Sequence, residues 1–92
     1  MAIGVTATLK VQDGMESDFE AVFRDLAAKV RANEPGNGLY QLFKSRKDKG
    51  TYIVMEVYQD QAALEAHGKS NHCRSAQPVL GGRPDVQFFD SI

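Results

Sequence analysis

The side chains best suited to chemistry in this 92-residue chain gather in one short stretch. His67, His72 and Cys73 lie within seven positions, and they are its only histidines and its only cysteine. Such residues can bind a metal ion or transfer a proton, and histidines also occur at helix ends, where a positive charge is mildly favoured. The spacing of the three residues helps to separate these interpretations.

A metal site is the interpretation that the spacing supports least. Two histidines on one helix face are three or four residues apart, whereas His67 and His72 are five apart, which rotates one from the other by about 140°. The chain has no further histidine or cysteine to complete a zinc shell, which normally takes four protein ligands. The sequence therefore predicts no metal, and Cys73 is interpreted as a small buried residue.

Proton transfer is the second interpretation. Histidine titrates close to neutral pH, so it is well suited to take a proton from a bound molecule. His67 is expected at the end of a helix that packs on a sheet, near Glu56 or the tyrosines. The alternative is that His67 only interacts with the helix C-terminus and that His72 begins the next helix. The residues by themselves leave both alternatives open.

The elements that must position these residues alternate between strand and helix. Apolar residues at every second position predict strands over residues 3–11, 39–46, 51–59 and 85–92. Helical spacing of apolar residues predicts a long helix that ends near Asn33, and Asp13 and Glu16 have the spacing of a capping box. Together with a helical region after the third strand, this order predicts an α+β, ferredoxin-like βαββαβ domain with an antiparallel sheet and its helices on one face.

The second helical region is expected to consist of two short helices. Asp60 is predicted to cap the first, which runs to about His67. Ser70 is predicted to cap the second, which runs towards Leu80, and Gly68 is expected to separate them.

The strand over residues 51–59 is apolar on both faces. Tyr52, Val54 and Tyr58 alternate with Ile53, Met55 and Val57, and Glu56 is the lone charge among them. Helices can cover one face, and in so small a chain a second copy is a plausible cover for the other. Glu56 is interpreted either as a structural residue, paired with a neighbouring strand or a partner subunit, or as a functional one.

The composition argues against nucleic acid and membranes as partners. The formal net charge is -1, and the 11 basic and 12 acidic residues are scattered along the chain. The stretch "KGTYIVME" corresponds in place to an RNA-binding signature, but Thr51, Ile53 and Glu56 occupy the positions of the base-stacking aromatic residues. No apolar run approaches the roughly 20 residues that cross a bilayer, and the first residues do not resemble a secretory signal, so a cytoplasmic location is expected.

Three segments of the chain resemble one protein family. They are Glu56-Val57-Tyr58-Gln59-Asp60, Ala63-Leu64-Glu65-Ala66-His67 and Ser70-Asn71-His72. Their order is similar to that of the antibiotic biosynthesis monooxygenase (ABM) family, and the upstream "EPGNGLYQLFKS" resembles the E-x-G-x-x-x-Y-x-L stretch of that family. The chain is therefore identified as a single ABM-like domain over residues 1–92.

The resemblance implies a homodimer in which two ferredoxin-like protomers form a dimeric α/β barrel. It also implies an apolar pocket between sheet and helices, with His67, Ser70 and His72 along its wall. Relatives include cofactor-free oxygenases of quinols and polycyclic phenols, haem-degrading enzymes and an isomerase of a phosphorylated signalling sugar. The haem-degrading branch relies on a tryptophan, and this chain has none and carries Tyr58 at that position.

The leading hypothesis is a cofactor-independent monooxygenase that acts on a hydroquinone or polycyclic phenol with molecular oxygen. In this scheme His67 takes the phenolic proton, and His72 orients or replaces it. The oxyanion is bound by Asn71 or by one of the tyrosines, and the apolar chamber contains three further residues. The tyrosines are Tyr40, Tyr52 and Tyr58, and the chamber residues are Phe23, Leu26 and Met55.

Two alternatives belong to other classes. The first is a non-catalytic dimeric module that binds a small apolar or aromatic molecule. The second is the sugar-phosphate isomerase, for which Lys69, Arg74 and Arg83 are the nearby cations.

Overall fold

The computed structural model describes residues 1–69 and 84–92. Its elements, in chain order, are β1 (Ile3–Lys10), α1 (Glu16–Asn33), β2 (Asn37–Lys44), β3 (Thr51–Tyr58), α2 (Gln61–Lys69) and β4 (Asp85–Asp90). The predicted βαββαβ order is confirmed. The helix predicted from Ser70 towards Leu80 lies outside the described residues.

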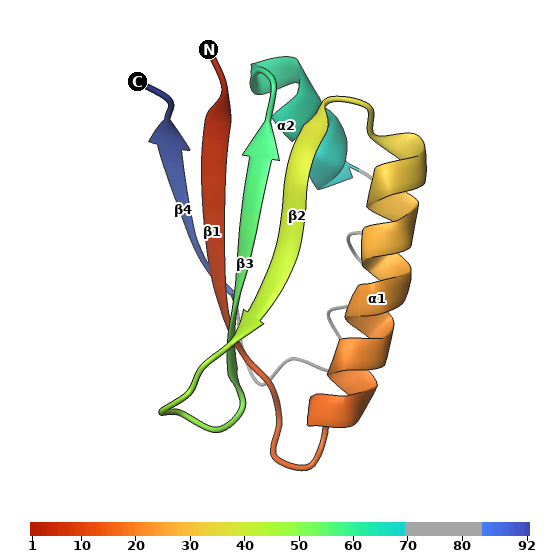
Figure 1. The fold of residues 1–92 in the computed structure, drawn as a ribbon, viewed down its shortest axis with the longest axis vertical. Helices are drawn as coiled ribbons and strands as arrows, with labels where there is room; N and C mark the ends of the chain where they lie inside the picture. The colour runs from red at the N-terminus through yellow and green to blue at the C-terminus, as the bar shows by residue number, and fades with distance from the viewer. Residues whose placement is uncertain (70–83) are drawn as a thin grey trace.

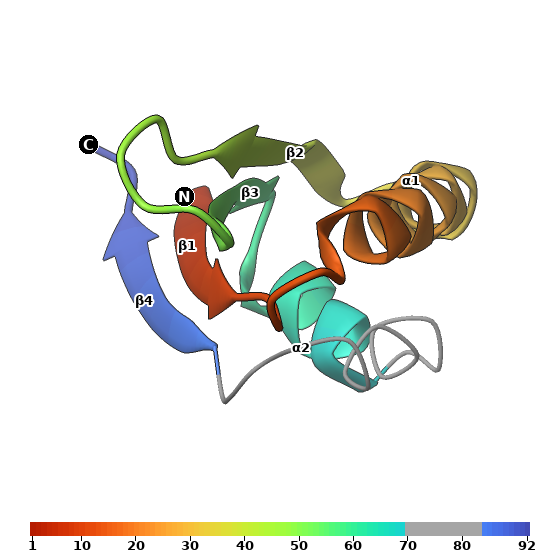
Figure 2. The ribbon, with the colours of Figure 1, turned by 90° about the horizontal axis from the view of Figure 1, so that it is seen from below.

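The four strands form one antiparallel sheet in the order β2-β3-β1-β4. Figures 1 and 2 show α1 and α2 on the same side of this sheet, which we call its inner face. The two chain ends lie side by side, and the backbone N–H of Ser91 donates to the carbonyl oxygen of Ala2 at 2.9 Å. The ferredoxin-like α+β fold is therefore as predicted.

The alternation of β1 determines which side chains face the helices. Ile3, Val5, Ala7 and Leu9 are buried on the inner face, and the residues between them point to the other side, the outer face. Apolar residues of α1 at helical intervals complete the core on this side; they are Phe19, Phe23, Leu26, Ala27 and Val30. The core therefore lies in a single layer between the inner face and the helices.

The helix ends differ in part from the expectation. The helix α1 begins at Glu16, and no side chain among the described residues caps it, so the capping box predicted from Asp13 is wrong. Gly14 has a φ of 83° and turns the chain between Asp13 and the helix, which moves the N-cap to Met15.

At α2 one expectation is confirmed and another is wrong. The carboxylate of Asp60 accepts from the backbone N–H of Ala63 at 2.9 Å, which is the predicted cap. Gly68 does not end the helix, which continues to Lys69. A single glycine costs a helix only about 1 kcal/mol relative to alanine, so it is a weak stop signal.

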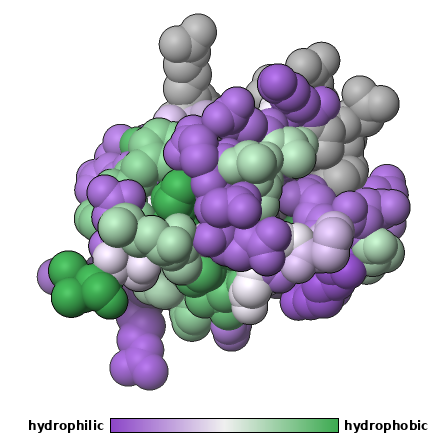
Figure 3. All heavy atoms as spheres, turned by 90° about the horizontal axis from the view of Figure 1, so that it is seen from above, coloured by the Kyte–Doolittle hydropathy of each residue, from purple (hydrophilic) through white to green (hydrophobic). Residues whose placement is uncertain are grey.

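The outer face of the sheet carries large apolar side chains that remain exposed. Leu39, Phe43, Met55 and Phe89 are 38–50% exposed, and strand register places them on this face. Figure 3 shows green, apolar atoms gathered along the lower left of the molecule, on the sheet side, while purple residues dominate the right. Among the described residues, no helix has the length and hydrophobicity needed to cross a membrane.

Candidate functional site

The helix α2 points His67 at the sheet. Asp60 fixes the start of the helix, and Ala63, Leu64 and His67 then follow at intervals of three and four residues, which places them on one face. Ala63 and Leu64 pack on the buried cluster of Ile3, Val5 and Tyr58. The same face therefore carries His67 inward, where it is 7% exposed. Its ring lies 5.2 Å from the ring of Tyr58 and 5.4 Å from that of Tyr40, between centroids.

The turn between α1 and β2 brings Glu34 to this histidine. Glu34 follows the last residue of α1, and its backbone N–H donates to the carbonyl oxygen of Val30 at 2.9 Å. Two residues later, Gly36 accepts from the backbone N–H of Gln59 at 2.9 Å. A Cβ atom on Gly36 would lie 2.6 Å from the Cβ of Ala63, so only glycine allows the turn to approach α2 this closely.

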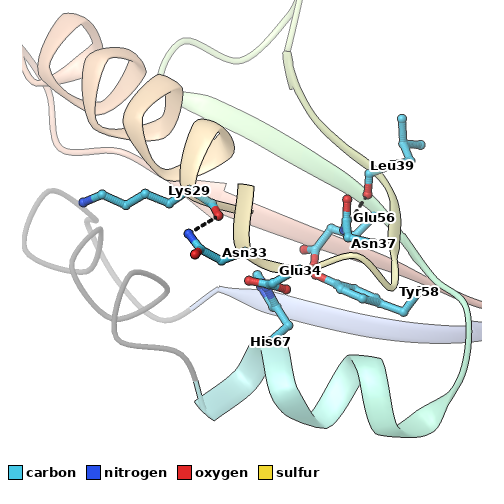
Figure 4. A network of polar contacts seen from close by, with 8 residues as sticks. All are labelled: Lys29, Asn33, Glu34, Asn37, Leu39, Glu56, Tyr58 and His67. Atoms are coloured by element: carbon cyan, nitrogen blue, oxygen red, sulfur yellow. Dashed lines mark hydrogen bonds and ion pairs between the residues drawn. The ribbon is translucent and has the colours of Figure 1, made fainter. Parts of the chain in front are cut away.

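Glu34 and His67 form the closest polar contact of the site. Nδ1 of His67 lies 2.9 Å and 3.1 Å from the two carboxylate oxygens of Glu34. Both side chains are nearly buried, at 8% and 11% exposed, and they point toward one another in Figure 4. A carboxylate at Nδ1 favours the proton on that nitrogen, which leaves Nε2 of a neutral ring as an acceptor.

Glu56 and Tyr58 form a second pair beside the histidine. The Tyr58 hydroxyl donates to Oε1 of Glu56 at 2.7 Å, and Nε2 of His67 lies 3.7 Å from the same oxygen. Burial raises the pKa of Glu56 above its usual range, and the charge of Glu34 acts in the same direction, while Tyr58 and His67 oppose them. Burial, followed by the neighbouring Glu56, also raises the pKa of Tyr58.

A cavity of about 290 Å³ lies between the helices and the inner face. Its described lining is mostly apolar, whereas Glu56 and His67 contribute polar groups. An apolar cavity with a few convergent polar groups is the usual form of a small-molecule site. The apolar lining includes Phe19, Phe23, Leu26, Val54, Leu64 and Phe88.

Four of the predicted site residues line this cavity. They are His67, Tyr40, Phe23 and Leu26. Tyr58 is fully buried and reaches the cavity through its hydrogen bond to Glu56 rather than directly. The predicted Asn71 and His72 lie outside the described residues, as do Arg74 and Arg83 of the isomerase alternative.

Two of the predicted pocket residues lie elsewhere. Met55 is on the outer face and 38% exposed, because its parity along β3 is opposite to that of Val54 and Glu56. Tyr52 is on the inner face but at the other end of β3, and its hydroxyl donates to Oε2 of Glu20 at 2.6 Å. Tyr52 does not line the cavity with His67.

Glu34 is a site residue that the sequence did not predict. The signal that could have identified it is its place in the E-x-G stretch, where Gly36 permits the close approach to α2. Its partner is 33 positions away, so only the tertiary structure joins the two residues. Across the described ranges, no group of three or more histidine, cysteine, aspartate or glutamate side chains is arranged to hold a metal ion.

Comparisons with known proteins agree on one family. The family model described as antibiotic biosynthesis monooxygenase (ABM) matches residues 2–79. The chain is 30% identical over 70 residues to "Putative monooxygenase YcnE" of Bacillus subtilis (strain 168), which covers 76% of this chain and 73% of the relative.

Solved structures of similar shape extend the comparison. A "putative antibiotic biosynthesis monooxygenase" from Caulobacter crescentus CB15 is 44% identical with a TM-score of 0.93, covering 99% of this chain and 90% of that one. SnoaB from Streptomyces nogalater, a cofactor-independent oxygenase, has the same fold, with 21% identity, a TM-score of 0.84 and coverage of 99% and 93%. With a family model that spans most of its length, the chain belongs to the antibiotic biosynthesis monooxygenase family.

Proposed function

We propose that this protein is a cofactor-independent monooxygenase that acts on a hydroquinone or a polycyclic phenol in the 290 Å³ cavity. The observation that carries the proposal is the pair of Glu34 and His67. The carboxylate contacts Nδ1 at 2.9 Å, and Nε2 lies 3.7 Å from Oε1 of Glu56, which lines the cavity together with His67. A histidine oriented by a buried carboxylate is a recurrent arrangement for a general base.

The first chemical step is the removal of a proton from the substrate. Nε2 of His67 accepts the phenolic proton, and the carboxylate of Glu34 stabilises the imidazolium that results. The deprotonated substrate is electron-rich and itself supplies electrons to molecular oxygen. One oxygen atom enters the substrate and the other leaves as water, so the four electrons that reduce oxygen all come from the substrate.

The cavity suits a compact aromatic ligand. Its volume lies near the lower end of the range for ligand pockets, about 300–1,000 Å³. Phe23 stacks on Tyr40 with an angle of 9° between the ring planes, so this wall presents aromatic surface. In our proposal the hydroxyl of Tyr40 binds the oxyanion of the substrate. Asn71 and His72 remain predictions for the same region.

The relatives support the reaction class. SnoaB is a cofactor-independent oxygenase with the same fold, and YcnE and the Caulobacter protein are named for monooxygenase activity. Their names do not include a substrate, so the substrate class proposed here depends on the shape and polarity of the cavity.

Oxygen consumption by metal-free protein tests the proposal. Wild type is mixed with a panel of hydroquinones and anthrones in an oxygen electrode, and the product is identified by mass spectrometry. We expect uptake above the buffer rate, and a loss of about 100-fold or more for His67→Ala, because general bases contribute about 10²–10⁴-fold. Glu65→Ala, an exposed change on α2, is the matched control and should retain the wild-type rate.

Two results would contradict the oxygenase. One is wild-type protein that consumes no oxygen above buffer while binding the same ligands, which favours a non-catalytic binding module. The other is His67→Ala with the wild-type rate. Binding that depends on a phosphate group, without oxygen uptake, would point to the isomerase instead.

We also propose that the protein works as a homodimer joined through the outer face. Leu39, Phe43, Met55 and Phe89 expose apolar surface there, and monomeric proteins rarely leave a contiguous apolar face uncovered. Sedimentation equilibrium should give twice the chain mass of 10.1 kDa. Met55→Lys should shift the protein towards monomers, whereas a lone wild-type chain at high micromolar concentration would contradict the dimer.

A further inference from the structure

Glu56 occupies a position where a carboxyl group is costly. It lies on the inner face of β3, paired with Val5 of β1 and Tyr40 of β2, and is 8% exposed. Removing a carboxyl group from water destabilises a fold unless the group is hydrogen-bonded or neutral. A buried carboxyl in the wall of a ligand cavity is therefore a candidate for a chemical role.

Glu56 and His67 both line the cavity and lie close together. Tyr58 donates to Oε1, and Nε2 of His67 lies 3.7 Å from that oxygen, which is too long for a hydrogen bond. A ligand in the cavity that contacts one of these groups therefore lies close to the other as well. The base and the carboxyl group can thus act on neighbouring atoms of the same substrate.

Burial and the charge of Glu34 favour the neutral form of Glu56, whereas Tyr58 and His67 oppose it. It is faced by the hydroxyl of Tyr58, the ring of His67 and the carboxylate of Glu34, with Tyr40 opposite it on β2 and apolar side chains on β1 and β4. Burial and the charge of Glu34 raise the pKa of Glu56, so it holds a proton to higher pH than an exposed glutamate does. Tyr58 occupies Oε1, and Oε2 is the oxygen that can carry this proton.

We propose that Glu56 is a second catalytic residue of this site, which donates a proton to the oxygen intermediate. This role rests on the proposed oxygenase function. With an anthrone in its phenolic tautomer, His67 first takes the phenolic proton, which gives the same anion as loss of a proton from the reacting carbon. The anion transfers two electrons to oxygen and forms a carbon–oxygen bond, which gives a peroxide anion. Glu56 protonates the terminal oxygen of that anion.

The remaining steps return both residues to their starting states. The glutamate anion removes the remaining proton from the reacting carbon while the oxygen–oxygen bond breaks, which yields the ketone and hydroxide. The hydroxide takes the proton held by His67 and leaves as water. One anthrone and one oxygen molecule therefore give one anthraquinone and one water.

The test compares two identical substitutions. Glu56→Gln keeps an oxygen that accepts from Tyr58 but cannot donate a carboxylic proton. We expect it to consume oxygen while the yield of quinone per oxygen falls at least twofold, with the substrate peroxide accumulating instead and detected by mass spectrometry. Glu20→Gln changes the other tyrosine-bonded glutamate and should keep the wild-type yield. Glu56→Asp, which retains a carboxyl group, should restore part of the yield.

The outcomes separate this role from the function itself. A wild-type protein that consumes no oxygen overturns the oxygenase, and with it this proposal. Oxygen uptake by Glu56→Gln with the wild-type yield overturns only the role of Glu56. If Glu56→Gln does not fold, the pH dependence of the wild-type protein provides the test. Its yield of quinone per oxygen should fall as pH rises, because Glu56 then loses its proton. A yield that is constant with pH would overturn the proposal.

Discussion

At each end of the inner face a tyrosine of β3 donates to a glutamate, Glu20 of α1 at one end and Glu56 of β3 at the other, and the two glutamates have pKa shifts of opposite sign. At one end Tyr52 donates to Glu20 at 2.6 Å, and at the other Tyr58 donates to Glu56 at 2.7 Å. The pKa of Glu20 is lowered, chiefly by the hydrogen bond from Tyr52, whereas that of Glu56 is raised, chiefly by burial. A similar hydrogen bond therefore accompanies a lowered glutamate pKa at one end and a raised glutamate pKa at the other.

The surroundings account for the difference. Glu20 lies at the surface, with Lys44 and Arg24 each 3.8 Å from its carboxylate. Glu56 is buried beside a cavity and close to a second carboxylate, that of Glu34. Water and cations support the charge at one end, while an apolar cavity opposes it at the other. In our proposal the reaction takes place at the Tyr58 end of the inner face, and the Tyr52 end takes no part in it.

The largest expected difference between substitutions near Tyr58 and substitutions near Tyr52 is in the rate of oxygen uptake. Glu34→Gln removes the carboxylate that orients His67, and we expect oxygen uptake to fall about 100-fold, in the range of acid–base contributions. Glu20→Gln should change the rate less than about twofold, since Glu20 does not line the cavity with His67. Steady-state rates and thermal melts of both variants check this, and equal losses in the two would contradict the assignment of the ends.

One methyl group at position 36 should disrupt the close approach between α2 and the turn that carries Glu34. Gly36→Ala places a Cβ atom 2.6 Å from the Cβ of Ala63, so the turn must move away from α2 and carry Glu34 with it. We expect a loss of about 1–3 kcal/mol in the free energy of unfolding, measured in urea, together with reduced activity. Gly38→Ala, whose Cβ would meet ordinary contacts at 3.9 Å, is the control. Wild-type activity in Gly36→Ala would show that this approach is not required.

The two glutamates should affect stability in opposite directions as pH changes. The raised pKa of Glu56 means that its stabilising effect is complete in acid, below the unfolded value near 4.5, and is lost as pH rises through the folded value. The free energy of unfolding of Glu56→Gln should therefore rise relative to that of wild type as pH increases. The lowered pKa of Glu20 means that its stabilising effect is present above the unfolded value and is lost in acid. The free energy of unfolding of Glu20→Gln should therefore fall below that of wild type above about pH 4.5. Urea unfolding across this pH range measures the stability difference of each variant from wild type. If the two differences changed in the same direction with pH, the comparison would be refuted.

The smallest expected effect is a shift of one carboxyl pKa. The hydrogen bond from Tyr52 is the main cause that lowers the pKa of Glu20, so Tyr52→Phe should move it back up towards 4.5. Carbon-13 NMR of the glutamate carboxyls follows the titration. Lys44→Met should produce a smaller rise, because its charge is a lesser cause. In the same pair, burial and Glu20 raise the pKa of Tyr52 to about 12.

The sequence predicted the faces of the elements better than the distances between them. The alternation in β1 and the helical spacing in α1 identified the core, because these periods directly decide which side chains point inward. Strand parity also placed Tyr52 and Tyr58 on one face. It could not show that Tyr52, which is six residues or about 20 Å along the strand from Tyr58, lies outside the cavity that Tyr58 adjoins.

The errors in the predicted site have physical causes. Both faces of β3 are apolar, so composition did not show that the helices cover the side of Val54 rather than that of Met55. Glu34 escaped notice because a carboxylate in a proline- and glycine-containing turn resembles an exposed loop residue. Its role depends on the turn contacting α2 at Gly36, which is a tertiary contact without a local pattern.

The most direct test of the account is ionisation of a ligand in the absence of oxygen. An anthrone whose anion absorbs visible light is mixed anaerobically with wild-type protein and with His67→Ala, at a pH where the free ligand is neutral. For wild type we expect the anion spectrum with one equivalent per chain, and for the variant the neutral spectrum. A bound ligand that stays neutral in wild type, or that ionises equally in His67→Ala, would contradict it.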